Sequence, residues 1–161
     1  MKIAILGAGK IARAMATTIN GMKEATNYAV ASRNLDKAKG FVKEFGIEKA
    51  YGSYEEMFQD PQVELVYVAT PHSHHCEHVK LCLNHGKHVL CEKSFSANKE
   101  EAIEMINLAK EKNLLLTEAI WTRYMPSRKI LDDVISSGII GEVSMLTANL
   151  GYVINDIKRL Q

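Results

Sequence analysis

The chain has 161 residues, of which 47% are hydrophobic and 24% are charged, and its formal net charge is +1 at pH 7. This length fits one domain and part of a second, and the apolar fraction is large enough to form a buried core. A net charge near zero argues against a protein that binds nucleic acid through bulk electrostatics. No apolar run approaches the length of a membrane span, and an apolar strand rather than a signal peptide opens the chain.

The three cysteines, Cys76, Cys82 and Cys91, form no C-x-x-C pair and are odd in number. Cysteines without a disulfide pattern are typical of proteins in a reducing compartment. We therefore expect a cytoplasmic protein with reduced thiols.

Short apolar runs alternate with helical patterns along most of the chain. This alternation predicts β-α-β units and a doubly wound parallel sheet, that is, an α/β fold of the Rossmann type. The expected strands are Ile3–Leu6, Tyr28–Ser32, Glu64–Ala69, His88–Cys91 and Leu114–Glu118, with a short strand or an extended link over Tyr51–Ser53. The expected helices are Ile11–Met22, Asp36–Phe45, Tyr54–Gln59, His74–His85, Asn98–Asn113 and Pro126–Ser137.

The spacing of apolar residues predicts which helix faces are buried. These faces consist of Ile11, Met15 and Ile19 in the first helix, and of Ala102, Met105, Ile106 and Ala109 in the fifth. Gly46 is expected to end the second helix, and Ser53 with Glu56 forms a capping box for the third.

The last part of the chain has a different character. A longer, half-exposed strand is expected over Glu142–Tyr152, where apolar and polar residues are mixed. We place a boundary near Trp121–Pro126. Residues 1–123 then form a nucleotide-binding domain, and residues 124–161 form a linker helix and the first strand of a second α/β domain.

A glycine-rich segment of the pattern G-x-G-x-x-A directly follows the first strand and opens the first helix. Gly7 permits a sharp turn, Gly9 lets the backbone approach a pyrophosphate, and Ala12 lets the helix pack closely on the sheet. The unpaired N–H groups and the dipole of the helix start favour a phosphate. The candidate contacts are Gly7, Ala8, Gly9, Lys10 and Ile11. A structural turn without ligand, or a site for another adenosine ligand such as S-adenosylmethionine, is the alternative.

The end of the second strand discriminates between the two nicotinamide cofactors. An NAD site usually has an acidic residue there, whereas this chain has Ser32 and Arg33 and no acid until Asp36. Because a guanidinium matches a phosphate, the sequence favours NADP over NAD, and Lys37 is placed to help. A solvated surface arginine is the alternative.

The ends of the next strands carry further polar residues. Ligands bind beyond the carboxyl ends of parallel strands, and Glu92 and Lys93 follow a wholly apolar strand directly. A lysine near a cationic nicotinamide has a lowered pKa and can exchange a proton. Lys93 is therefore the candidate catalytic residue.

The segment Gly86–Lys93 closely resembles the signature of the Gfo/Idh/MocA oxidoreductases, the family of glucose–fructose oxidoreductase and inositol dehydrogenase. The resemblance covers the whole chain, and it looks closest to the dihydrodiol dehydrogenase branch. The other matching segments are the glycine turn, Ala31–Arg33, Ala69–Pro71 with His75, Trp121–Tyr124 and Gly138–Val143.

The resemblance implies a role for each matching residue. Lys93 matches the catalytic lysine beside the nicotinamide, and Glu92 helps to hold the cofactor end of the site. Thr70, Pro71 and His75 match positions that line the nicotinamide and its ribose. Trp121 and Arg123 match residues that pack along the cofactor.

Two departures from the family are visible. Ser94 replaces the proline after the motif lysine, so the loop loses a fixed φ and gains an N–H donor. Family members also carry a second α/β domain, which supplies a histidine or tyrosine for acid–base catalysis and the usual dimer surface. That part lies beyond Gln161, so we expect the 1–161 chain alone to be inactive and the full-length protein to be a homo-oligomer.

Several of these residues also have simpler interpretations. The group His72, His74, His75 and His78 fits no standard zinc spacing, so no metal is expected. Cys91 is either a reactive thiol beside Lys93 or a core residue. Trp121 packs between domains or along the cofactor, and Lys93 is catalytic or a partner of Glu92.

The sequence thus leads to two hypotheses. The first is an NADP-dependent dehydrogenase that transfers a hydride between nicotinamide and a CH–OH or C=O carbon of a sugar, cyclitol or dihydrodiol, with Lys93 assisting proton transfer. The second is a non-catalytic dinucleotide-binding module that acts as a sensor or regulatory subunit. Neither requires a nucleic acid or a membrane as partner.

Overall fold

A computed structural model describes residues 1–149 and 151. These residues belong to two compact units, Met1–Ile120 and a second that begins at Trp121. Within the described residues, no helix is both long enough and apolar enough to cross a bilayer.

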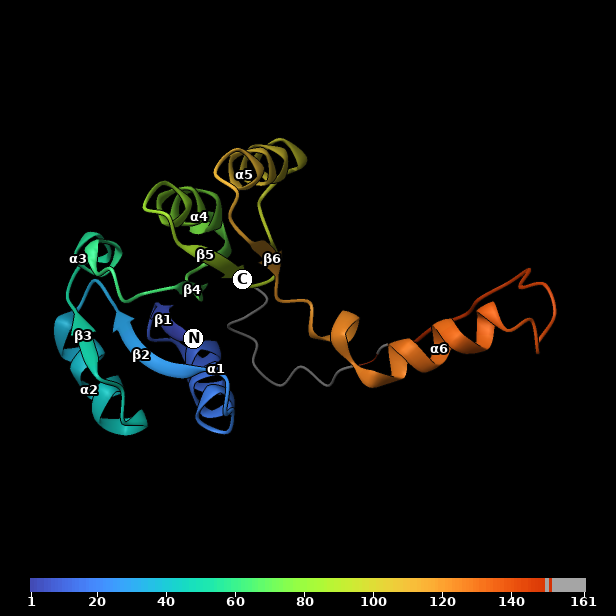
Figure 1. The fold of residues 1–161 in the computed structure, drawn as a ribbon, viewed down its shortest axis with the longest axis horizontal. Coiled ribbons are helices and arrows are strands. Elements are labelled where there is room, and N and C mark those ends of the chain that lie inside the picture. The colour runs from blue at the N-terminus through green and yellow to red at the C-terminus, as the bar shows by residue number, and fades with distance from the viewer. Residues whose placement is uncertain (150, 152–161) are drawn as a thin grey trace. The chain divides into compact units, whose positions relative to one another are not determined.

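The first unit is built on a six-stranded sheet in which all strands run parallel (Figure 1). The spatial order is β3-β2-β1-β4-β5-β6, so the winding direction reverses between β1 and β4. The strands are β1 (Lys2–Leu6), β2 (Thr26–Ala31), β3 (Lys49–Tyr51), β4 (Leu65–Val68), β5 (His88–Cys91) and β6 (Leu116–Glu118). This topology confirms the predicted Rossmann fold.

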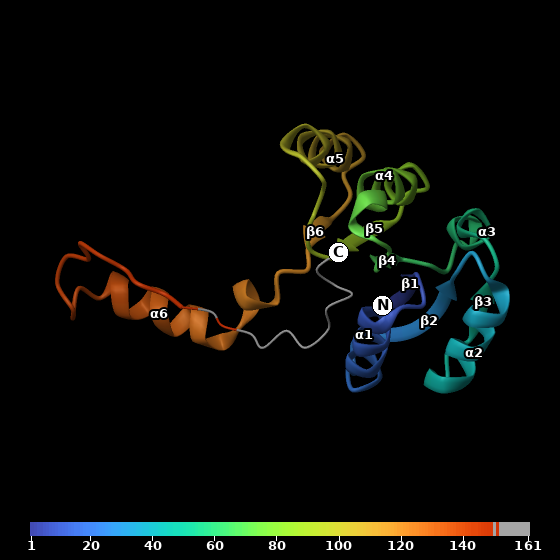
Figure 2. The same ribbon diagram turned by 180° about the vertical axis from the view of Figure 1, so that it is seen from behind.

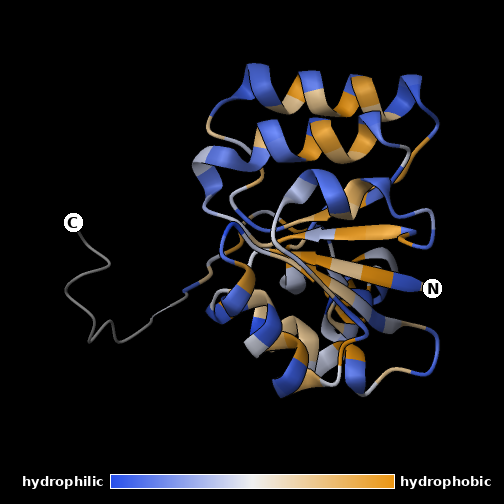
Figure 3. Ribbon diagram, turned by 90° about the vertical axis from the view of Figure 1, so that its left-hand side faces the viewer, coloured by the Kyte–Doolittle hydropathy of each residue, from blue (hydrophilic) through white to orange (hydrophobic). Residues whose placement is uncertain are grey.

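Helices cover both faces of the sheet, as Figures 1 and 2 show from opposite sides. Helices α1 and α2 pack on one face, and α3, α4 and α5 pack on the other. Their bounds are α1 (Lys10–Asn20), α2 (Leu35–Phe45), α3 (Tyr54–Gln59), α4 (His75–Asn84) and α5 (Lys99–Glu111), with a 3₁₀ turn η1 (His72–His74) before α4. In Figure 3 the strands and the inner sides of the helices are apolar, because these surfaces form the two layers of core.

Local side-chain contacts fix where the helices begin and end. Asn34, Ser53 and Asn98 each accept a hydrogen bond from the backbone N–H three residues on, which caps α2, α3 and α5. Gly46 ends α2 with φ 68°, a left-handed conformation that suits glycine. Because Ser53 serves as a cap, β3 ends before it, at Tyr51, rather than at the expected Ser53.

Two side chains predicted to be in the core are exposed instead. Ile11 is 46% exposed and Ile106 is 41% exposed. In each case the neighbouring residue, Ala12 or Met105, is fully buried. Because successive helix residues are rotated by about 100°, the buried faces include the predicted Ile19, Met105 and Ala109 but turn away from Ile11 and Ile106.

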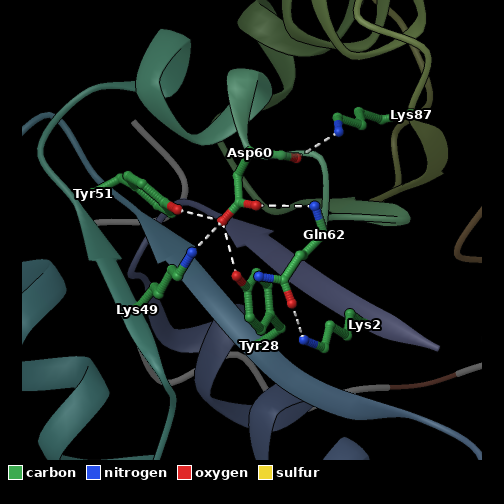
Figure 4. Close-up of polar contacts among 7 residues, drawn as sticks. All are labelled: Lys2, Tyr28, Lys49, Tyr51, Asp60, Gln62 and Lys87. Carbon is green, nitrogen blue, oxygen red and sulfur yellow. Dashed lines mark hydrogen bonds and ion pairs between the residues drawn. The ribbon is translucent and has the colours of Figure 1, made fainter.

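A buried carboxylate ties the β2–β3 side of the sheet to α3 (Figure 4). One Asp60 oxygen, Oδ2, accepts bonds from Tyr28 Oη at 2.9 Å, Lys49 Nζ at 2.8 Å and Tyr51 Oη at 2.6 Å. Its other oxygen accepts from the Gln62 backbone N–H at 2.9 Å. Burial by itself raises the pKa of Asp60, but these donors hold that pKa well below its usual range.

The second unit contains a 3₁₀ turn, η2 (Trp121–Tyr124), and helix α6 (Pro126–Ser136), with proline in its first turn as predicted. Ion pairs join Arg128 to Asp132 and Lys129 to Asp133 one helical turn apart. The strand predicted over Glu142–Tyr152 is absent from residues 142–149, which have no regular secondary structure. No described neighbouring strand pairs with them, and a strand needs such a partner. The rest of that prediction lies outside the described residues.

Candidate functional site

The carboxyl ends of neighbouring strands lie in register at one edge of the sheet. Leu6 at the end of β1 pairs with Ala31 of β2 and with Val68 of β4. Val68 pairs with Cys91 of β5, and Cys91 pairs with Glu118 of β6. The residues that follow these strands therefore form one row across the edge where parallel sheets bind ligands.

The glycine turn lies in this row. Gly7 has φ 103° and donates its N–H to Ala31 O at 2.9 Å, and a Cβ there would lie 3.0 Å from Ala69 O. The fold itself therefore requires glycine at position 7. Gly9 is different, because a Cβ at this position meets nothing within 4 Å. Gly9 is the N-cap of α1 and no side chain caps this helix start, so the turn presents free space in front of helix N–H groups.

The two residues that follow β2 differ in their exposure to solvent. Ser32 is buried, donates its N–H to Tyr51 O at 3.1 Å and accepts a bond from Asn34 N through its hydroxyl at 3.3 Å. Arg33 is exposed, and within the described residues its guanidinium makes no ion pair or hydrogen bond. The charge of Arg33 is thus available to an external anion.

A pocket of about 410 Å³ opens between Arg33 and the turn that follows β4. It is lined by Arg33, Gly52, Ser53, Tyr54, Glu55, Thr70, Pro71, His74, Glu77, His78 and Leu81. His78 forms a hydrogen bond from Nδ1 to Thr70 Oγ1 at 2.9 Å, and its ring meets Tyr54 edge-on at 5.0 Å. Burial lowers the pKa of His78, which favours the neutral ring. The pocket therefore combines aromatic surfaces with one cationic guanidinium and the two carboxylates of Glu55 and Glu77.

The loop that carries Lys93 is held by its neighbours on both sides. Tyr67 of β4 donates its hydroxyl to Glu92 Oε1, and Glu92 Oε2 accepts from the Lys93 backbone N–H at 3.2 Å. On the other side, Phe95 N–H donates to Glu118 Oε1 at 2.9 Å. The peptide bond between Lys93 and Ser94 is cis. The Lys93 side chain is exposed and makes no ion pair with Glu92, so an anchored loop presents a solvent-facing ammonium.

His75 does not line a surface of the site. Its side chain is 1% exposed, with Nδ1 2.7 Å from Ser94 O and Nε2 2.9 Å from Thr70 O. Both polar atoms of the ring thus have protein partners. His75 connects two loops of the site instead of offering a free contact to a ligand.

One other side chain at the strand ends, that of Cys91, belongs to the core. Cys91 is fully buried, and burial together with Glu118 and Glu92 raises the pKa of its thiol to about 12. This favours the core interpretation of Cys91 over the reactive thiol. The part of the chain that the structure describes contains no cluster of three or more metal-ligating side chains.

Trp121 and Arg123 belong to the second unit, where both lie in η2 and are exposed. Their expected contact with the cofactor stays a prediction.

Four residues that hold the site were not identified from the sequence. Tyr67, Glu118 and His78 bond to Glu92, Phe95 and Thr70, as described above. The fourth is Arg13, which donates to Ala8 O at 3.4 Å and pairs with Glu44 at 2.8 Å, thereby linking the glycine turn to α2. Tyr67 gave a signal as a hydroxyl within an otherwise apolar strand, and His78 and Glu118 were visible as polar residues near strand ends, but their partners were not predicted.

Comparison with known proteins decides the family. The sequence profile described as "Oxidoreductase family, NAD-binding Rossmann fold" matches residues 1–120, three quarters of the chain. The chain belongs to the Gfo/Idh/MocA oxidoreductases. Its first unit is therefore an NAD(P)-binding domain of this family, and it contains the glycine turn, Arg33, Thr70 and Lys93.

Related sequences and solved structures agree with this assignment. Trans-1,2-dihydrobenzene-1,2-diol dehydrogenase of Mus musculus is 41% identical over 157 residues, which are 96% of this chain and 47% of that protein. The enzyme of the same name from Homo sapiens is 46% identical over 131 residues, which are 81% of this chain and 39% of that protein.

Among solved structures, the 3-ketoreductase KijD10 from Actinomadura kijaniata, in complex with TDP-benzene and NADP, superposes with a TM-score of 0.79 at 31% identity. That match covers 88% of this chain and 45% of the reductase. Apo scyllo-inositol dehydrogenase from Lactobacillus casei gives a TM-score of 0.80 at 25% identity, over 88% of this chain and 43% of the other. The chain thus spans less than half the length of these relatives.

Proposed function

We propose that the chain is the NADP-binding part of a dehydrogenase that acts on a CH–OH or C=O carbon of a small polyol, sugar or dihydrodiol. The observation that carries this proposal is Arg33. It follows β2 directly, lines the pocket beside Thr70 and has no anionic partner among the described residues. A planar guanidinium in this place suits the 2′-phosphate that distinguishes NADP from NAD.

The glycine turn and the start of α1 fit the pyrophosphate of such a cofactor. The space in front of Gly9 and the uncapped helix start leave backbone N–H groups free to bind phosphate oxygens. Gly7, Ala8, Gly9, Lys10 and Ile11 would hold this part of the cofactor. Ile11 is exposed rather than part of the core. An exposed apolar side chain at this position suits contact with a bound cofactor.

The far end of the cofactor would lie toward the β4 and β5 loops. Thr70 and Pro71 follow β4, and Glu92 follows β5 in the same row of strand ends. A bound nicotinamide supplies or accepts the hydride. The residues of this chain provide the surfaces against which the cofactor and the substrate are oriented.

Lys93 is the group we assign to proton transfer. Its backbone is fixed through Glu92 and Tyr67, whereas its ammonium extends into solvent. An ammonium at this position donates a hydrogen bond to a carbonyl oxygen and stabilises the alkoxide that develops as the carbonyl is reduced. In the reverse direction the amine accepts the hydroxyl proton.

The substrate class is proposed from the related proteins. The relatives named above are a dihydrodiol dehydrogenase and a 3-ketoreductase, whose names describe the oxidation of a diol and the reduction of a ketone. Because the chain covers less than half of each, the residues that select a substrate are expected outside it.

Cofactor binding tests the proposal directly. Titration calorimetry of NADPH and NADH with Arg33→Ala should show a loss of about 1.5–3 kcal/mol for NADPH, the strength of a hydrogen bond to a charged group, and little change for NADH. Lys43→Ala, an exposed lysine in the last turn of α2, is the matched control and should change neither affinity. Equal losses for both cofactors would show that Arg33 does not read the 2′-phosphate.

Turnover tests the catalytic part. Full-length protein should oxidise members of a panel of sugars, cyclitols and dihydrodiols with NADP, the Lys93→Ala variant should be strongly impaired, and residues 1–161 alone should bind NADPH without turnover. Full-length protein that binds NADPH but converts none of the panel would favour the regulatory module instead.

A further inference from the structure

His75 is the first residue of α4, and its ring lies between two segments of the candidate site. Nδ1 is 2.7 Å from Ser94 O in the loop after β5, and Nε2 is 2.9 Å from Thr70 O in the turn after β4. Both lengths are those of ordinary hydrogen bonds. The side chain is 1% exposed, so water does not replace either partner.

The two partners of His75 are both backbone carbonyl oxygens, which can only accept. A neutral imidazole has one N–H and one lone pair, so it can donate to one of these oxygens and must turn its lone pair toward the other. Only the ring with both nitrogens protonated can donate to Thr70 O and Ser94 O at once. The number of bonds that His75 makes is therefore set by its proton count.

The neighbouring His78 provides an internal contrast. It bonds to the same residue, Thr70, but through the hydroxyl Oγ1 rather than the carbonyl. A hydroxyl both donates and accepts, so a neutral His78 keeps its bond in either tautomer. The number of ring protons therefore limits how many hydrogen bonds His75 can make, but it does not affect the bond of His78.

We propose that His75 is a positioning residue that ties the Lys93 loop to the β4 turn through two bonds, and that loss of one ring proton releases one of them. The position of Ser94, and with it that of Lys93, then depends on the protonation of a buried histidine. The effect of these hydrogen bonds on catalysis rests on the proposed role of Lys93. The proton-dependent bonding of His75 does not rest on that role.

Several titratable and charged groups lie near the His75 ring. On its own helix the titratable neighbours are His74, Glu77 and His78, and the loop that it bonds carries Glu92 and Lys93.

Nuclear magnetic resonance of the 1–161 chain without cofactor tests the tie. We expect both His75 ring nitrogens to be protonated at the acid end of a titration that starts near pH 5, and one of them to lose its proton in a single step as the pH rises. The Phe95 amide follows the Ser94 carbonyl directly, and the His72 amide is the first N–H after the Thr70 carbonyl because Pro71 has none. Both amide signals should shift with the same midpoint. Ring nitrogens that stay singly protonated throughout, or amide signals that do not follow the His75 midpoint, would overturn the proposal.

A pair of variants on the same helix provides the second test. His75→Gln carries both of its N–H donors on one nitrogen and so cannot donate from two separate ring positions as the doubly protonated histidine does. His85→Gln alters an exposed histidine at the other end of α4. Hydrogen exchange read by mass spectrometry should be roughly tenfold faster for residues 92–96 in His75→Gln, as expected for the loss of one hydrogen bond. His85→Gln should leave this segment unchanged.

These outcomes are separate from the test of cofactor binding. If His75→Gln exchanges like the parent protein although it is folded, the tie is wrong even where NADPH binds as proposed. If Arg33→Ala shows no cofactor selectivity while the His75 titration moves the loop, the cofactor proposal fails and the tie stands. The titration uses the unaltered protein, so it decides the question even if His75→Gln does not fold.

Discussion

Tyr67, in the middle of the sheet on β4, donates its hydroxyl to Glu92, the residue that precedes Lys93. The tyrosine is 1% exposed, and burial together with this bond raises the pKa of its hydroxyl well above the usual range. A core side chain thus holds the backbone from which the candidate catalytic lysine projects. The site and the core are in this way parts of the same packing arrangement.

We expect Tyr67→Phe to lower stability, because the half-buried Glu92 loses a donor while the aromatic volume is kept. The cost should be about 1–3 kcal/mol, measured by denaturant unfolding. Tyr54→Phe is the control, since the Tyr54 hydroxyl has no hydrogen-bond partner within the described residues, and it should change stability by less than about 0.5 kcal/mol. Similar losses in both variants would mean that the Tyr67–Glu92 bond contributes nothing.

The two glycines of the turn should respond differently to substitution. Gly7→Ala places a Cβ 3.0 Å from Ala69 O at φ 103°, so we expect lower stability, by more than about 1 kcal/mol. Gly9→Ser fills open space at an N-cap position that serine prefers, so we expect unchanged stability but weaker NADPH binding. Thermal unfolding and calorimetry separate the two effects. A Gly9→Ser variant that binds NADPH normally would exclude a close approach of the pyrophosphate.

The buried carboxylate of Asp60 should make the fold sensitive to acid. Its pKa is held well below the usual range by its four donors, so its contribution to stability is complete above about pH 4 and is lost as the pH falls through the folded-state pKa. Asp60→Asn should cost about 1–3 kcal/mol at pH 7. This difference from the parent protein should shrink below about pH 4. Asp36→Asn, an exposed aspartate in the first turn of α2, serves as the control in denaturant unfolding across this range.

The three cysteines should differ in reactivity. Cys82 and Cys91 are fully buried and burial raises the pKa of both thiols, whereas Cys76 is half-buried. Alkylation near pH 8 followed by peptide mapping should therefore label Cys76 alone in the folded protein, and slowly, since burial also raises the pKa of its thiol. All three should react in denaturant. Labelling of Cys91 before Cys76 would restore the reactive-thiol interpretation.

Much of the first unit could be predicted from the sequence. Apolar runs and cap residues are local signals, so β5 was placed at its actual bounds, and α2 was predicted to begin at Asp36, one residue after its actual start at Leu35, and to end at Phe45 as found. Local signals were insufficient where the structure depends on which face of a helix contacts the sheet, or on whether a strand has a neighbour to pair with. Ile11 and Ile106 were assigned to the core from spacing alone, although both side chains lie outside the faces that contact the sheet. The strand predicted beyond Glu142 has no described neighbouring strand with which to pair.

The sequence by itself determined the class of fold and the glycine turn, and it singled out Arg33 and Lys93 as candidate residues for binding a ligand and for catalysis. These depend on residue type and order, which the chain displays directly. Only the tertiary structure decided that Tyr67 supports Glu92 and that the His75 ring joins two carbonyl oxygens. Those contacts join residues that are 25, 19 and 5 positions apart in the chain, and only the in-register parallel strands and the helix packed on them bring the atoms together.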